Sequence, residues 1–451
     1  MRPERNALDS SSQIAVVGGG LAGLAAALAI GSSGHQVKVF EARPFLGGRA
    51  TSYPLNTADE ESPTIDNCQH VLLRCCTNLM DFYGRLGVAD RIHFYREFYW
   101  IEPGGRMSVM RRGLLPAPLH FTESFATLKF LSIADRLGIG RALLSVPREY
   151  RTRKDLDRIT MMDWLREKKQ GTHAIERFWR QILVSAISED VERMAAIHAL
   201  QVFAVGFLSS ASAYEMGVPN VPLADLYGAR AWARYPQVQF AFRSPVQRIH
   251  VEDGRFAGLA VNGDCIPAEA CVLAIPFEKV TAIAPDLGLN LAPFTHSPIT
   301  GIHLWFDRPI TDLPHATLLD RTIQWMYNKE AGRHIQLVVS ASRSLVEMGR
   351  AEVIEMALRE LKEFFPKASE AVLERAHVVK EVRAIFSAVP GLGKVRPESR
   401  TAVANLYLAG DWTRSGWPAT MEGAVRSGYL AAEALLRAQG GAGQFLLPDI
   451  A

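Results

Sequence analysis

Three glycines near the start of the chain have the spacing of a phosphate-binding turn. They are Gly18, Gly20 and Gly23, in the pattern Gly-x-Gly-x-x-Gly. In such a turn the first glycine allows a tight bend, the second lets a pyrophosphate approach the backbone, and the third lets a helix pack closely on a strand. Glu41 follows about 20 residues further along, where a carboxylate binds ribose hydroxyls. This set predicts a dinucleotide site.

A second group of residues could approach the same ligand. Gly47 and Gly48 form a pair whose backbone can come close to a bound molecule, because glycine has no side chain to prevent it. Arg43 and Arg49 flank the pair, and their guanidinium groups suit phosphate oxygens. No metal site is predicted, since the five cysteines lack metal-ligand spacing and their odd number indicates free thiols: Cys68, Cys75, Cys76, Cys265 and Cys271.

The elements that must position the glycines are a strand, a helix and a second strand. Residues 14–17 are an apolar run typical of a buried parallel strand, and residues 21–30 have a helical pattern. A second apolar strand at 36–40 ends in Glu41. Such a β-α-β unit points the helix N-terminus at the phosphates and predicts an α/β fold class.

The rest of the chain changes character twice. Helices are expected at 78–86, 125–146, 160–169 and 173–188, with Thr160 and Asp163 as a capping-box-like start. A β-meander is expected from alternating segments at 238–242, 246–252, 256–261 and 270–275, with Asp253-Gly254 and Asn262-Gly263 as hairpin turns. Short strands and a helix at 345–365 follow, and a strand ending at Asp411 and a helix at 422–439 close the chain.

Composition excludes some classes of partner. The 50 Lys and Arg nearly balance the 47 Asp and Glu, so nothing indicates nucleic-acid binding. Residues 104–153 differ, because nine basic and three acidic residues alternate there with apolar ones. This stretch could lie on an anionic membrane, or form a helix that packs on the core and solvates its charges.

At most, the sequence predicts peripheral contact with a membrane. No apolar run approaches the length of about 20 residues that spans a bilayer. Residues 1–10 lack the apolar core of a signal peptide. We therefore expect a cytoplasmic protein, possibly peripheral at the inner face of the cell membrane.

Three blocks of sequence together resemble the flavin-containing amine oxidase and carotenoid desaturase superfamily. They are VVGGGLAGLAAA with FEARPFLGGRA, the segment ACVLAIP, and LYLAGDWTRSGWPATMEGAVRSGYLAAEAL. The resemblance implies a Rossmann-type FAD-binding domain with an inserted substrate domain, α/β with α+β elements in the substrate lobe. The FAD-binding domain would comprise residues 1–77, 231–297 and 386–451. The substrate domain would comprise 78–230 and 298–385, with possible membrane-facing helices.

The same resemblance implies roles for individual residues. The glycines would hold the FAD pyrophosphate, Glu41 the ribose, Val246 the adenine, and Asp411 the ribityl or pyrophosphate oxygens. Backbone amides near Met421 would face the flavin. The complete predicted cofactor set is Gly18, Gly20, Leu21, Ala22, Gly23, Glu41, Ala42, Arg43, Gly48, Arg49, Val246, Gly410, Asp411, Met421, Gly423 and Ala424.

Two details bear on the class of substrate. Amine oxidases of the superfamily commonly place an aromatic residue just before the Met-Glu-Gly-Ala segment, where this chain has Thr420. An aromatic cage for an amine is therefore depleted. No cysteine lies in the last block, so non-covalent FAD is expected.

A further segment, residues 65–87, is similar to the hydroxysqualene dehydroxylase family. Its sequence is IDNCQHVLLRCCTNLMDFYGRLG, in which Cys68 and Arg74 replace glycines of the family pattern. Segments 178–183 and 219–226 also resemble that family. The resemblance implies that reduced FAD removes an allylic hydroxyl from hydroxysqualene, giving squalene for hopanoid synthesis.

Because hydroxide is a poor leaving group, an acid must protonate it. Asp66 and His70 are the candidates, since this loop should run near the flavin, although Asp66 could instead hold the loop through backbone hydrogen bonds. Aromatic residues such as Phe178, Trp179, Phe203 and Phe207 could line a substrate tunnel or pack in the core.

Other readings stay open. They are a carotenoid desaturase or isomerase, a flavin amine oxidase, and a non-catalytic flavin-fold chaperone or lipid carrier.

Overall fold

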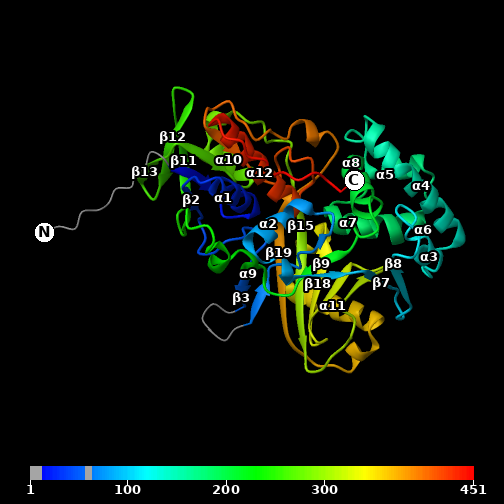
Figure 1. Cartoon of the computed structure of the whole chain (residues 1–451). Helices are drawn as coiled ribbons and strands as arrows, with labels where there is room; N and C mark the ends of the chain where they lie inside the picture. The colour runs from blue at the N-terminus through cyan, green and yellow to red at the C-terminus, as the bar shows by residue number, and fades with distance from the viewer. Residues whose placement is uncertain (1–12, 56–62, 451) are drawn as a thin grey trace.

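The protein is described by a computed structural model that covers residues 13–55 and 63–450. Residues 1–10, on which the expectation about a signal peptide rests, lie outside the described residues. The chain forms two lobes joined by a long sheet (Figure 1).

The glycine turn belongs to a five-stranded parallel sheet, which we call the glycine-turn sheet. Its order is β10-β2-β1-β14-β20, and every pairing is parallel. The strands are β1 (Ile14–Val17), β2 (Val37–Phe40), β10 (Val238–Ala241), β14 (Ala270–Leu273) and β20 (Leu406–Leu408). They are short and almost wholly apolar, as expected for strands buried on both faces.

Two helices from opposite ends of the chain pack against each other beside this sheet. These are α1 (Leu21–Ser32) and α12 (Met421–Ala438), which run side by side in Figure 1. They approach closely at Gly428, where an added Cβ would lie 2.2 Å from the carbonyl oxygen of Ala22. The predicted helices at 21–30 and 422–439 are thus present within two residues at each end.

The predicted meander is smaller than expected. Only β11 (Val246–Glu252), β12 (Arg255–Val261) and β13 (Asp264–Pro267) form it, and Asp253 and Asn262 adopt positive φ at its turns, as hairpin turns require. The prediction was wrong for 238–242 and 270–275, which are strands of the glycine-turn sheet. A buried parallel strand and a meander strand share an apolar pattern, so the pattern did not separate them.

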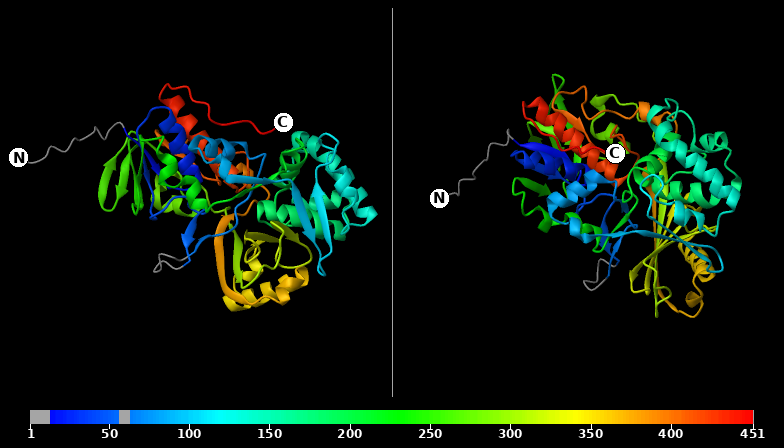
Figure 2. Two further views of the ribbon diagram at one scale, coloured as in Figure 1. Left: turned by 60° about the horizontal axis from the view of Figure 1, so that its bottom comes forward. Right: turned by 45° about the vertical axis from the view of Figure 1, so that its right-hand side comes forward.

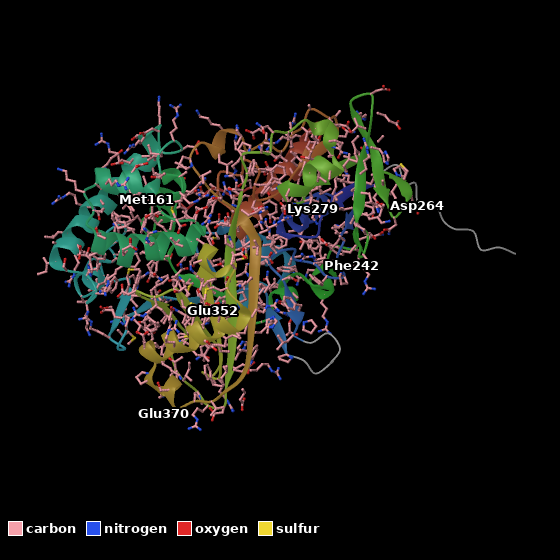
Figure 3. The ribbon with its side chains drawn as sticks, turned by 180° about the vertical axis from the view of Figure 1, so that it is seen from behind. Met161, Phe242, Asp264, Lys279, Glu352 and Glu370 are labelled. Carbon is pink, nitrogen blue, oxygen red and sulfur yellow. The ribbon has the colours of Figure 1, made fainter. Side chains whose placement is uncertain are left out.

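A mixed seven-stranded sheet forms the lower part of the molecule in Figure 1. In order it contains β19 (Leu373–Phe386), β15 (His296–Phe306), β18 (His334–Ser340), β17 (Trp325–Glu330), β16 (His315–Leu318), β7 (Glu97–Ile101) and β8 (Met107–Arg111). Helix α11 (Arg350–Phe364) packs on it. Seen from behind, Glu370 lies at the opposite end of the molecule from Asp264 of the meander (Figure 3).

Two small sheets complete the strands. One pairs β3 (Ser52–Pro54) with β4 (Thr64–Asp66). The other has the order β5 (Leu72–Leu73), β9 (Met216–Pro219) and β6 (Ile92–Tyr95).

Helices α3 to α8 form a lobe beyond the long sheet (Figure 2). The helices between the sheets and in this lobe are α2 (Thr77–Leu86), α3 (Thr122–Ala126), α4 (Ile133–Thr152), α5 (Met161–Glu167), α6 (Thr172–Ala174), α7 (Gln181–Ile187), α8 (Ala196–Gln201), α9 (Leu223–Tyr227) and α10 (Phe277–Ile283). The chain takes up π-helical turns at Ile175–Arg180 and Val202–Phe207. Among the described residues, no helix is long and apolar enough to cross a membrane.

The helix predicted at 125–146 is two helices. Helix α3 ends at Ala126, and α4 begins at Ile133 after Ser132, which forms a capping box with Asp135. This start signal lay inside the apolar pattern and was not recognised. The predicted capping box of Thr160 and Asp163 is present, as N-cap and third residue of α5.

The domain boundaries given above stay a prediction.

Candidate cofactor and substrate cavity

One continuous cavity of about 580 Å³ runs from the glycine turn into the space between the lobes. This volume is within the range of about 300–1,000 Å³ typical of small-molecule sites. Its first part is lined by polar residues from loops beside the glycine-turn sheet, among them Glu41, Arg49 and Asp411. Its second part, which we call the chamber, is mainly apolar and is lined by Cys68, Phe98, Trp100, Met110, Phe207, Trp325 and Tyr327. The uncharged polar side chains of Gln181, Ser185 and Thr317 lie beside them in the same lining.

The glycines fit their predicted roles differently. Gly18 has φ of +107°, and a Cβ there would lie 2.4 Å from the carbonyl oxygen of Ala274. Gly20 lines the cavity and is the N-cap of α1, without a side-chain cap of its own. The first amides of α1 therefore stay available to an anion. Gly23 does not line the cavity. An added Cβ would lie 1.9 Å from the oxygen of Gly18, so Gly23 allows the close contact of helix and strand.

Glu41 ties the glycine turn to the loop that follows β2. Its carboxylate accepts hydrogen bonds from the amide of Gly19 at 2.7 Å and the amide of Arg43 at 2.8 Å. Glu41 is buried and lines the cavity. Each carboxylate oxygen has more than one lone pair, so it can also accept a bond from a ribose hydroxyl.

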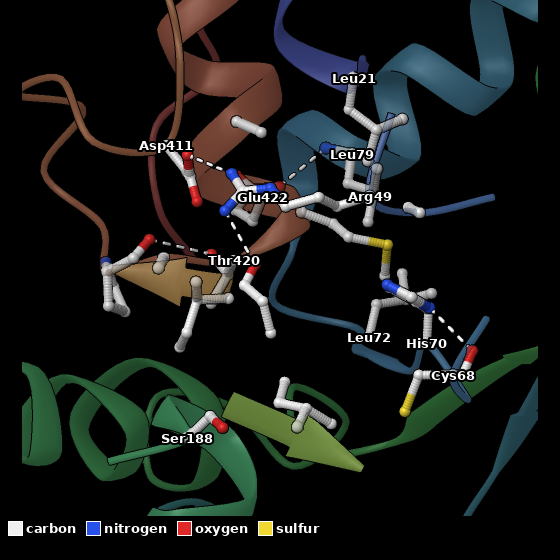
Figure 4. Close-up of a pocket in the computed structure, with 18 of the residues that line it drawn as sticks. Leu21, Arg49, Cys68, His70, Leu72, Leu79, Ser188, Asp411, Thr420 and Glu422 are labelled. Atoms are coloured by element: carbon white, nitrogen blue, oxygen red, sulfur yellow. Dashed lines mark hydrogen bonds and ion pairs between the residues drawn. The ribbon is translucent and has the colours of Figure 1, made fainter. Parts of the chain in front are cut away.

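An ion pair spans the middle of the cavity. Arg49 donates to the carboxylate of Asp411 at 2.7 Å and to the carbonyl of Ala384 at 2.8 Å. Figure 4 shows Arg49 and Asp411 facing each other, with Ser188 across the cavity. The backbone of Gly48 passes close to the glycine turn, because a Cβ on Gly48 would lie 3.0 Å from the Cα of Gly20. Further predicted residues that line the cavity are Leu21, Ala22, Ala42, Arg43, Val246 and Gly410.

The start of α12 also faces the cavity, through Met421 and Ala424. Here the structure corrects the role of Gly423. Its amide donates to the Thr420 hydroxyl at 3.0 Å, and the amide of Ala424 donates to the Thr420 carbonyl at 2.9 Å. The first amides of the helix, those of Met421 and Glu422, have no such bond among the described residues, so they are the ones that can meet a ligand.

Asp66 does not line the cavity. Its buried carboxylate accepts hydrogen bonds from the Ser52 hydroxyl at 2.6 Å and the Leu223 amide at 3.0 Å. The ammonium of Lys329 lies 3.7 Å away. Asp66 thus fastens β4 to β3 and to the start of α9, which is the alternative role given for it above.

His70 does line the cavity, four positions further on. Its Nδ1 donates to the carbonyl oxygen of Cys68 at 2.9 Å, as Figure 4 shows, so the neutral ring keeps an unprotonated Nε2. Burial lowers the pKa of His70, against opposing effects of the Cys68 carbonyl and the Asp66 charge. Of the two predicted acids, the structure brings only His70 to the cavity.

The sequence reasoning missed most of the chamber. Phe98 and Trp100 project from β7, and Trp325 and Tyr327 from β17, each pair two residues apart on its strand. This alternation was the available signal. Of the aromatic residues considered for a tunnel, Phe207 lines the chamber, whereas Phe178, Trp179 and Phe203 are buried in the core.

The sequence matches a known family along most of its length. The pattern of the family described as flavin containing amine oxidoreductase covers residues 21–436. Similar curated proteins include the probable zeta-carotene desaturase of Synechococcus elongatus, 26% identical over 95% of this chain and 99% of that protein. The 15-cis-phytoene desaturase of Synechococcus elongatus is 23% identical over 95% of this chain and 96% of that protein.

Solved structures share the fold. An engineered putrescine oxidase matches with a TM-score of 0.73 at 17% identity, covering 95% of this chain and 99% of that one. An oxidoreductase from Methanosarcina mazei matches with a TM-score of 0.71 at 17% identity, covering 94% and 100% of the two chains.

Proposed function

The chain belongs to the flavin-containing amine oxidoreductase family and its cofactor is FAD, and from this premise we propose that it removes the allylic hydroxyl of hydroxysqualene to give squalene. The C–O bond breaks, a C–H bond forms, and the oxygen departs as water after it gains a proton. Bound in its reduced form, FAD supplies the hydride for the new C–H bond. Two electrons per turnover must then come from an external donor.

We assign the binding of FAD to the polar part of the cavity. Glu41 would hold the ribose, the amides at the start of α1 the pyrophosphate, and the amides of Met421 and Glu422 the flavin ring. The positive end of the α12 dipole favours negative charge on the ring. Arg49 and Asp411 would position the region between phosphate and flavin.

The observation that carries the choice of substrate is the chamber. Seven of its lining residues are aromatic, thioether or thiol side chains, the polar ones beside them are hydroxyl or amide groups, and none of these carries a charge at neutral pH. Burial raises the pKa of the Cys68 thiol to about 12, so this group stays neutral too. A long hydrocarbon is stabilised by such a surface, whereas an ammonium group would be desolvated without a partner.

His70 is the residue that we propose to serve the leaving oxygen. It is the predicted acid that faces the cavity, and its Nε2 is free of the hydrogen bond that occupies Nδ1. When protonated, Nε2 would donate to the hydroxyl as the C–O bond breaks. A lowered pKa makes the imidazolium a stronger acid, although a less populated one.

Carotenoid-type desaturation is the second candidate. It is favoured by the curated desaturases that this chain resembles over 94–95% of its length. The same chamber would accept a polyene precursor, and His70 in its neutral form would act as a base.

Parallel incubations distinguish the two. We expect holoenzyme reduced with dithionite under argon to convert hydroxysqualene to squalene, detected by mass spectrometry. Oxidised holoenzyme given phytoene should leave it unchanged. A desaturated product from phytoene, together with no squalene from hydroxysqualene, would refute the proposal in favour of the second candidate.

A matched pair of variants tests the role of His70. His70→Gln should keep its FAD and lose most dehydroxylation, because the side chain no longer delivers a proton. His93→Gln, at an exposed position on β6, should behave as wild type. Equal rates for both variants would remove His70 from the reaction.

A further inference from the structure

An unusually apolar surface lies at the outer edge of the helical lobe. It comprises Leu114, Leu115 and Leu119 of the loop after β8, and Ile133, Leu137 and Leu144 of α4. We call these six residues the apolar edge. Their exposed fractions run from 43% for Leu115 to 95% for Leu114. They are six of the twelve large apolar residues that are strongly exposed in the described part of the chain, so the exposure is concentrated here.

Helix α4 has apolar side chains on its solvent-facing side as well as on its buried side. Its inner side is formed by the buried residues Ile139, Ala142 and Val146. The outward stripe, at helical spacing, begins with apolar residues and ends with basic ones: Ile133, Leu137, Arg141, Leu144, Arg148 and Arg151, all of them exposed. A helix that merely solvates its charges would not place three large apolar side chains on its water-facing side.

The loop and the helix are held together as one surface. The amide of Gly113 donates to the carbonyl of His120, and that of Leu114 to the carboxylate of Glu123 on α3. Arg136 of α4 donates to the carbonyl of Ala126 at the end of α3. In Figure 1, α3 and α4 lie at the edge of the molecule farthest from the meander. The exposed leucines of the loop are therefore presented by a folded segment.

Cationic side chains surround the apolar edge. Arg112, Lys129, Arg141, Arg148 and Arg151 are exposed, and none of them takes part in the ion pairs found among the described residues. Exposed leucines and unpaired basic residues on one segment of the chain complement one surface well, the interface of a bilayer with anionic headgroups.

An aromatic layer connects this edge to the chamber. Phe121 of the same loop lies beside Phe207, with ring centroids 6.2 Å apart, and Phe207 lines the chamber. Phe207 in turn neighbours Phe98, another chamber residue, at 6.2 Å. Packed aromatic rings thus connect the segment that carries the apolar edge to the wall of the chamber.

We propose that the apolar edge and its arginines dock on an anionic lipid bilayer, and that the hydrocarbon substrate passes from the bilayer past Phe121 into the chamber. The entry step depends on the proposed function, because it takes the substrate to be a polyprenoid. The docking step stands on the exposed residues alone.

Vesicle flotation tests the docking. We expect holoenzyme to float with vesicles of phosphatidylcholine and phosphatidylglycerol, and to bind pure phosphatidylcholine vesicles far more weakly. The triple variant L114S/L119S/L137S should lower the partition coefficient on the order of 10²-fold or more, given the free energy of burying leucine. R141S/R148S/R151S should lower it on the order of 10²-fold for anionic vesicles, at about 1 kcal/mol for each basic residue near the surface.

Matched controls come from exposed residues elsewhere. V372S/V382S and R248S/R359S/K362S remove similar side chains far from the apolar edge and should bind as wild type. Binding that survives L114S/L119S/L137S would overturn the proposal. So would a wild-type dimer in sedimentation that this variant converts to monomers without a change in vesicle binding, because the edge would then join two copies of the chain.

A substrate assay separates this inference from the proposed function. L114S/L119S/L137S should match wild type on detergent-solubilised hydroxysqualene and lose at least tenfold on vesicle-embedded hydroxysqualene. If neither form is converted while vesicle binding persists, the proposed function fails and the docking surface stands. If the solubilised substrate is converted but no protein floats, the docking fails alone.

Discussion

Asp66 and His70 show how strongly the role of a side chain depends on its neighbours. They are four residues apart on one loop, yet the Asp66 carboxylate is occupied by Ser52 and the Leu223 amide, while the His70 ring opens to the cavity. The substitution Asp66→Asn would keep one side-chain oxygen as a hydrogen-bond acceptor and remove the negative charge near Lys329. We expect Asp66→Asn to lower the stability of the protein, and substitutions of His70 to lower turnover.

The pH dependence of turnover follows from the lowered pKa of His70. If the imidazolium donates the proton, its fraction grows about tenfold for each pH unit lost between pH 8 and 7, because that range lies above its ordinary pKa of about 6.5. The single-turnover rate with pre-reduced holoenzyme should rise in proportion. His70→Gln should be slower by about 10²-fold or more and flat in this range. A wild-type rate that stays constant between pH 8 and 7 would contradict proton donation by the His70 imidazolium.

Glu41 should control the affinity for FAD. Glu41→Gln removes the charge that accepts bonds from Gly19 and Arg43, and a charged hydrogen bond contributes about 1.5–3 kcal/mol. We expect the Kd of the apoprotein for FAD to rise about 10- to 100-fold in a fluorescence titration. Glu374→Gln, exposed on β19, is the control and should leave Kd unchanged. An unaltered Kd for Glu41→Gln would contradict its assigned role.

The two parts of the cavity were not equally predictable. Gly18, Gly20 and Glu41 act within one β-α-β unit, so their spacing in the sequence carries the geometry. The chamber arises because β7 and β17 both pair with β16, which joins residues more than 200 positions apart. Such pairing leaves no local signal beyond alternation. Gly423 could not be assigned from its spacing, because its amide donates to the Thr420 hydroxyl within the same helix start.

At the scale of elements, the packing of α1 on α12 should be sensitive to a single methyl group. Gly428→Ala would place its Cβ 2.2 Å from the Ala22 oxygen, so the helices must separate, at a cost of about 1–3 kcal/mol. Because we assign the pyrophosphate of FAD to the amides at the start of α1, we expect FAD retention to fall as well. Thermal unfolding and the flavin-to-protein absorbance ratio measure both effects.

Gly84 of α2 is the matched control. An added Cβ at Gly84 meets nothing within 4 Å, and the position is helical and exposed. Gly84→Ala should therefore stabilise the protein by up to about 1 kcal/mol and leave its flavin content unchanged. Equal behaviour of the two variants would show that α1 and α12 are less tightly packed than the structure indicates.

At the scale of the whole molecule, buried histidines should set the acid limit of stability. Burial lowers the pKa of His303 and His315 to about 4, and of His198 and His334 to about 3. Below pH 6.5 the unfolded chain binds protons at these sites and the folded chain does not, so stability falls as the pH falls towards 4. Each group contributes up to about 1.4 kcal/mol per pH unit.

His315 allows a direct test. Its two ring nitrogens are buried without partners in the described structure, among Tyr95, Phe98 and Trp325. His315→Phe should fit among these aromatic rings. Between pH 7 and 5 its free energy of unfolding, measured with urea, should fall by about 2 kcal/mol less than that of the wild type. His93→Gln, at an exposed site, should leave the pH dependence unchanged. Parallel curves for wild type and His315→Phe would contradict the assignment.

The contact between α1 and α12 has a consequence for how the protein is made. The glycine turn leaves the ribosome early, but the helix that completes its packing is almost the last to be synthesised. At about 5–20 residues per second, the turn waits on the order of tens of seconds for its partner. A prematurely terminated chain therefore lacks one wall of the cavity to which we assign FAD, and we expect cofactor loading to select for full-length protein.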